Sequence, residues 1–204
     1  AGGFEQFAAK SYGEKISFLA DAAAASGKRL IIRDWPTLNF LSGIHWNYFF
    51  PSGVLEQDFY LDRYSLQRHS AVVSRRSASV YESLKRSFPH LKQLSVDDFS
   101  SAYLAYAQAV ASFPVIHFEE FCEAPVREFR RLCEALRCSF SEDFLTAYKS
   151  FVNCTGDNNL AATSRGDSSD RILPLTDNRE TPAWKAATRD ERCRAADRIL
   201  GYVQ

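Results

Sequence analysis

The chain carries no net charge and contains no long apolar run. Its 25 lysine and arginine residues are balanced by 25 aspartates and glutamates. This balance excludes a broad nucleic-acid-binding or membrane-binding face, but it is compatible with a local basic pocket. No apolar stretch approaches the length of a transmembrane helix, and the first residues lack the pattern of a signal peptide. We therefore expect a soluble, cytoplasmic protein without a nucleic-acid or membrane partner.

Cysteine pairs of the CxxC type are also missing. The five cysteines form no disulfide-like framework, and their odd number is typical of reduced thiols in the cytosol. The nearest histidine, His117, lies at the end of a strand-like run, so no zinc site is expected. We expect no bound metal.

Apolar runs of strand length alternate with amphipathic stretches of helix length. The short apolar runs that predict buried strands are residues 29–33, 70–74 and 114–118. The stretches that predict helices are residues 4–25, 77–88, 99–110, 125–136 and 189–200. This order predicts a single α/β domain over residues 1–204, with a parallel sheet flanked by helices.

Charged residues follow each of the three predicted strands. These strands end at Arg33-Asp34, at Arg75-Arg76 and at Glu119-Glu120. In parallel sheets, ligands bind beyond the carboxyl ends of the strands. We therefore expect these charges to gather at one edge of the sheet, beside a ligand.

The most informative stretch runs from Val72 to Ser83. Arg75 leaves a predicted strand, and Ser83 follows eight residues later inside the next predicted helix. A guanidinium supplies charge and a planar set of donors, and a hydroxyl adds a neutral donor, so the two can converge on one anion. The alternative interpretation is an ordinary strand-to-helix turn with a solvated arginine. The arrangement resembles the sulfotransferase family, in which an arginine and a serine at this spacing hold the 3′-phosphate of 3′-phosphoadenosine 5′-phosphosulfate (PAPS).

Other segments resemble the same family in the same order, from about residue 28 to residue 202. They are the strand with its acidic pair in residues 115–121, the Ala124-Pro125 helix start, the Ser164-Arg165-Gly166 loop and the closing segment 195–202. The resemblance implies a P-loop nucleotide-binding-like sulfotransferase fold. It implies sulfuryl transfer from PAPS to a hydroxyl or amine of a small molecule or glycan, leaving adenosine 3′,5′-bisphosphate (PAP). It also implies that Arg165 and Gly166, in the polar loop 153–182, help Arg75 and Ser83 to hold the 3′-phosphate.

One part of the family pattern has no counterpart here. Sulfotransferases have a strand followed by a Gly/Ser/Thr-rich loop that wraps the 5′-phosphosulfate with backbone N–H groups. Ser26-Gly27-Lys28 lacks the first glycine and the Ser/Thr after lysine that a phosphate loop needs, and we interpret it as a helix C-cap. Either such a loop precedes this sequence, or the chain is a non-catalytic nucleotide-binding or scaffold domain.

The acceptor side leaves two candidates for the base that takes the acceptor proton. Asp34 stands at a predicted strand end, where family members place a histidine, but the neighbouring Arg33 lowers the pKa of a carboxylate and weakens it as a base. His45 has the more suitable intrinsic acidity. It lies in the aromatic stretch 35–60, which is either a cover over an apolar acceptor or part of the core.

Overall fold

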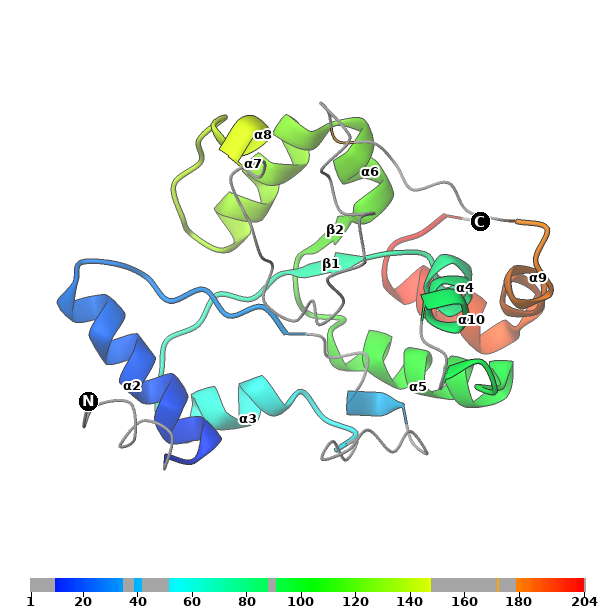
Figure 1. Cartoon of the computed structure of the whole chain (residues 1–204), viewed down its shortest axis with the longest axis horizontal. Helices are drawn as coiled ribbons and strands as arrows, with labels where there is room; N and C mark the ends of the chain where they lie inside the picture. Colours follow the sequence, from blue (N-terminus) through cyan, green and yellow to red (C-terminus); the bar gives the residue numbers. More distant parts are fainter. Residues whose placement is uncertain are drawn as a thin grey trace.

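The protein is an α/β fold in which helices surround a small parallel sheet. The computed structural model describes residues 10–34, 39–41, 52–87, 91–147, 172 and 179–203. Strand β1 (Val72–Ser74) pairs in parallel with β2 (Val115–His117), and Ser74 is opposite His117 in the register. Figure 1 shows α6 (Phe118–Glu123) and α7 (Pro125–Ala135) on one side of this sheet and α5 (Val96–Ala109) on the other.

Helices connect the two strands and pack against the end of the chain. Between β1 and β2 the chain forms α4 (Ser77–Ser87) and α5, as the alternation of apolar runs predicts. Helix α10 (Glu191–Ile199) packs on α4 and α5, and α9 (Pro182–Arg189) packs on α4 (Figure 1). The remaining helices are α2 (Tyr12–Ala25), α3 (Glu56–Arg63) and α8 (Phe144–Ala147).

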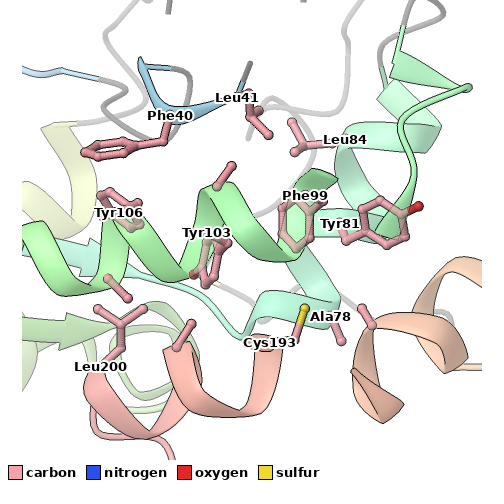
Figure 2. Packing of buried hydrophobic residues seen from close by; sticks show 14 of the residues in the cluster. Phe40, Leu41, Ala78, Tyr81, Leu84, Phe99, Tyr103, Tyr106, Cys193 and Leu200 are labelled. Carbon is pink, nitrogen blue, oxygen red and sulfur yellow. The ribbon is translucent and has the colours of Figure 1, made fainter. Parts of the chain in front are cut away.

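A row of aromatic side chains forms the centre of the core. Phe99, Tyr103 and Tyr106 come from one face of α5, and Tyr81 of α4 continues the row (Figure 2). Ring centroids along this row are 4.9, 5.3 and 5.7 Å apart, within the range of favourable aromatic contacts. The spacing of aromatic residues in the sequence predicts this buried face of α5, and the structure confirms it.

Several predicted elements are confirmed with shifted ends. The predicted strands 70–74 and 114–118 are present as β1 and β2, and Pro125 stands in the first turn of α7. The helix predicted over residues 4–25 is described from Tyr12. The helix predicted over residues 189–200 is present as α10, and Asp190 caps it by accepting from the N–H groups of Arg192 and Cys193. Helix α9 before it was not predicted.

The predicted buried strand 29–33 is wrong. This segment has no regular secondary structure, and the side chain of Ile31 is 71% exposed, with Leu30 and Ile32 also exposed. The segment is rich in β-branched residues, but a strand needs a pairing partner, and neither β1 nor β2 pairs with it.

The aromatic stretch 35–60 lies partly outside the described residues, which include 39–41 and 52–60. Phe40 and Leu41 are buried in the core, above the α5 row (Figure 2). At its other end the stretch is helical, because α3 begins at Glu56. The core interpretation therefore applies to Phe40 and Leu41.

Candidate functional site

The carboxyl ends of the two parallel strands bring Arg75, Arg76 and Glu119 to one edge of the sheet. The backbone N–H of Arg76 donates to Glu119 Oε1 at 3.2 Å. This contact joins the turn after β1 to the first turn of α6, which follows β2 directly. The prediction that Arg75 and Glu119 share an edge is confirmed. It is wrong for Arg33-Asp34, which ends no strand.

The end of the chain closes over this edge. The chain turns back after α10 at Gly201, whose φ of +84° suits glycine, and Tyr202 then packs against the strand ends. The Tyr202 hydroxyl donates to Glu119 Oε2 at 2.9 Å and accepts from the Ser74 hydroxyl at 3.2 Å. Burial raises the pKa of Tyr202 far above its ordinary value, so the phenol remains a hydrogen-bond donor at every physiological pH.

Arg76 is held by the same terminal segment. Its guanidinium donates to the carbonyl oxygen of Val203 at 3.3 and 3.4 Å. The same group lies 5.0 Å from the centroid of the Tyr202 ring, within the range of a cation–π contact. Arg76 therefore has a structural role in joining the turn after β1 to the end of the chain.

Arg75 is fixed through its backbone and lies beside an aromatic ring. Its carbonyl oxygen accepts from the Tyr103 hydroxyl at 2.7 Å, and burial holds the pKa of this tyrosine well above its ordinary value. The Arg75 guanidinium lies 5.6 Å from the centroid of Phe118, the first residue of α6. The side chain of Arg75 is partly exposed, so a solvent-borne ligand can reach it.

The start of α4 is satisfied by a carboxylate from α10. Asp197 accepts from both the backbone N–H and the hydroxyl of Ser77, each at 2.9 Å. Burial raises the pKa of Asp197, and the two hydrogen bonds from Ser77 oppose that shift. The first N–H of α4 therefore already donates to an acceptor within the protein.

His117 ties the end of β2 to the terminal segment. Its Nε2 is 2.8 Å from the carbonyl oxygen of Leu200, and its Nδ1 is 3.0 Å from Glu120 Oε1. A carbonyl oxygen only accepts, so Nε2 carries the hydrogen of the first bond. The imidazole also stacks on Tyr202, with 4.2 Å between ring centroids.

The remaining predicted site residues are placed only in part. Ser83 is partly buried within α4, about 9 Å along the helix axis from Ser77. Its convergence with Arg75 on one phosphate remains a prediction. Asp34 is exposed, and its charge adds to burial in raising the pKa of Tyr106 to about 12. His45, Arg165 and Gly166 lie outside the described residues, as does most of the loop 153–182.

The sequence did not single out Tyr202, Asp197 or Glu119 as parts of one cluster. The signal that could have pointed to Tyr202 is the Gly201-Tyr202 pair directly after a predicted helix, since glycine at a helix end commonly reverses the chain. The contacts themselves join residues that are 83 and more than 100 positions apart, which no local pattern reveals.

No family model, curated protein or solved structure matches the chain. Within the described ranges, no helix is both long and apolar enough to cross a membrane. The same residues contain no cluster of histidine, cysteine, aspartate and glutamate side chains that could hold a metal ion.

Proposed function

We propose that the chain is part of a PAPS-dependent sulfotransferase and that Arg75 binds the 3′-phosphate of the nucleotide. The observation that carries this proposal is the position of Arg75, directly after the carboxyl end of a parallel strand and just before α4. Ligands of parallel α/β folds bind at such strand ends. The resemblance of the Arg75–Ser83 spacing and of residues 115–125 to the sulfotransferase family supplies the identity of the ligand.

The spacing to Ser83, eight residues later, favours Arg75 over Arg76 as the phosphate ligand. Arg76 binds the Val203 carbonyl and contacts the Tyr202 ring, so it takes part in holding the end of the chain. Arg75 has its backbone fixed by Tyr103, so its guanidinium projects from a defined turn. A charged, planar donor on a fixed turn suits a phosphate, and the Ser83 hydroxyl adds a neutral donor.

The expected reaction moves a sulfuryl group from PAPS to a hydroxyl or amine of a small molecule or glycan, leaving PAP. It needs a bound donor, an acceptor atom in line with the bond that breaks, and a base for the acceptor proton. Arg165 and Gly166 would complete the 3′-phosphate site. Asp34 or His45 would act as the base, and Asp34 is exposed as that role requires.

A second candidate is a non-catalytic nucleotide-binding or scaffold domain. The observation that favours it is that neither strand among the described residues leads into a phosphate loop: β1 is followed by Arg75-Arg76 and α4, and β2 is followed directly by α6. Only the first candidate transfers sulfate, and it needs the phosphate loop to do so. Incubation of a loop-containing parent protein with sulfur-labelled PAPS and a panel of phenols, amines and glycans therefore separates them, because only the enzyme yields a labelled acceptor.

Isothermal titration calorimetry with PAP tests the binding site itself. A charge-assisted hydrogen bond contributes about 1.5–3 kcal/mol, so Arg75→Ala should weaken binding by about tenfold to a hundredfold. Ser83→Ala should weaken it less, because the hydroxyl is neutral. Arg86→Ala is the matched control, since Arg86 lies at the other end of α4 and pairs with Glu82 at 3.2 Å. Equal affinity of the parent and Arg75→Ala would remove Arg75 from the site.

A further inference from the structure

Two hydrogen-bonded residues connect the turn that carries Arg75 and Arg76 to the end of the chain. Glu119 uses one carboxylate oxygen for the Arg76 N–H and the other for the Tyr202 hydroxyl. Tyr202 in turn accepts from Ser74, the last residue of β1. The turn is thus bound on both sides, at Ser74 and at Arg76, by a pair of side chains from other elements.

The Ser74–Tyr202 hydrogen bond is buried, the Tyr202–Glu119 bond is partly buried and the Glu119–Arg76 bond is exposed. The side chains of Ser74 and Tyr202 are 3% and 6% exposed. A buried polar group without a partner is strongly unfavourable, so the pair has little freedom to rearrange. The ring of Tyr202 also contacts the His117 imidazole and the Arg76 guanidinium, which further fixes its position.

We propose that Glu119 and Tyr202 are positioning residues that hold the Arg75–Arg76 turn in the conformation that binds the nucleotide 3′-phosphate. This inference rests on the proposed function. Neither residue needs to touch the ligand. Glu119 acts through the backbone N–H of Arg76, and Tyr202 acts through the side chain of Ser74. The terminal segment 200–203 thereby supports the binding site, although Arg75 lies more than a hundred residues earlier in the sequence.

The test compares Tyr202→Phe with Tyr81→Phe. Both substitutions remove a buried phenol hydroxyl and keep the ring, and the Tyr81 hydroxyl donates to the Leu94 carbonyl at 2.7 Å, in another part of the core. We expect Tyr202→Phe to weaken PAP binding by about threefold to tenfold. Tyr81→Phe should leave the affinity unchanged. Parental affinity in Tyr202→Phe, or an equal loss in both variants, would overturn the inference.

Substitution of Glu119 provides a graded version of the same test. Glu119→Gln keeps an oxygen for the Arg76 N–H and a polar group beside Tyr202, so it should bind PAP more tightly than Glu119→Ala. If the substitutions only lowered the stability of the fold, the folded fractions of Glu119→Gln and Glu119→Ala would bind PAP with similar affinity. Glu123→Ala is the matched control, because Glu123 is exposed at the end of the same helix.

A second measurement does not depend on the ligand. Hydrogen exchange of the Arg76 amide reports whether the turn opens locally. We expect exchange of this amide to be faster in Tyr202→Phe and Glu119→Ala than in the parent, and unchanged in Tyr81→Phe. If the parent fails to bind PAP but the amide responds in this way, the proposed function fails while the turn-holding role stands. If the amide exchanges at the parental rate in all variants, the positioning role itself fails.

Discussion

The carboxylate of Asp197 in α10 accepts two hydrogen bonds from Ser77, the first residue of α4, and both are 2.9 Å long. An aspartate from another helix thus performs the task that an N-cap side chain usually performs within one helix. Helix α4 follows the Arg75–Arg76 turn directly, so this contact also fixes where the turn ends. It joins the last helix of the chain to the start of the segment that carries the proposed phosphate ligands.

We predict that Asp197→Ala lowers the free energy of unfolding by about 1–3 kcal/mol, because it leaves the buried N–H and hydroxyl of Ser77 without their acceptor. The measurement is urea unfolding followed by circular dichroism. Asp143→Ala, which changes an exposed aspartate in the loop before α8, should stay within about 0.5 kcal/mol of the parent. Identical unfolding midpoints for Asp197→Ala and the parent would show that the Ser77 contact contributes nothing.

The pH dependence of stability should reflect the raised pKa of Asp197. Burial raises its pKa above the ordinary 3.8, so the folded state holds this proton more tightly than the unfolded state does. The resulting stabilisation is present below the unfolded pKa and is lost as pH rises through the folded pKa. The melting temperature of the parent minus that of Asp197→Asn should therefore be larger at pH 3 than at pH 7. A difference that is constant, or that changes in the opposite direction, would contradict the burial of this carboxylate.

The contribution of Glu120 to stability should change with pH in the opposite direction. The hydrogen bond from His117 is the largest cause that lowers the pKa of Glu120 from 4.5, and the charges of His117, Arg131 and Arg127 act in the same direction. Its stabilising contribution is present above the unfolded pKa and is lost as pH falls through the lower folded value. The melting-temperature advantage of the parent over Glu120→Gln should therefore shrink between pH 6 and pH 3. Glu123→Gln, an exposed change on the same helix, should show no such trend.

Thiol chemistry gives a prediction about the core. Burial is the main cause that raises the pKa of Cys193 to about 12, and its side chain is fully buried. A pKa of about 12 in place of the ordinary 9.0 leaves about a thousandfold less thiolate at pH 8. Timed alkylation with mass spectrometry should show that the partly exposed Cys138 reacts before Cys193 and that Cys193 reacts only after denaturant is added. Equal rates in the native protein would contradict the packing of α10 on α4.

Local patterns predicted the elements whose partners are close in sequence. The aromatic spacing of Phe99, Tyr103 and Tyr106 located the buried face of α5, and the strand-to-helix transition at Arg75 was found because an apolar run precedes a helical one. The placement of Arg75 and Glu119 at one edge followed from the rule that the carboxyl ends of parallel strands lie at the same edge of the sheet. These features depend on periodicity and connection order, which a sequence displays directly.

The features that the sequence could not supply depend on distant partners. Residues 29–33 have the composition of a strand, but pairing decides whether such a run becomes one, and neither β1 nor β2 pairs with it. Tyr202 and Asp197 gain their roles only because α10 returns to the strand ends (Figure 1). Helix α9 was not predicted, although Thr181 caps it and Pro182 stands in its first turn.

Recognition of the 3′-phosphate of an adenosine nucleotide by Arg75 is the basis of the proposed function. The most direct measurement compares the affinities for PAP and for adenosine 5′-monophosphate, which lacks that phosphate, in the parent and in Arg75→Ala. We expect the parent to prefer PAP by about tenfold to a hundredfold and Arg75→Ala to lose most of this preference. Equal binding of the two nucleotides by the parent, or an undiminished preference in Arg75→Ala, would contradict the proposed function.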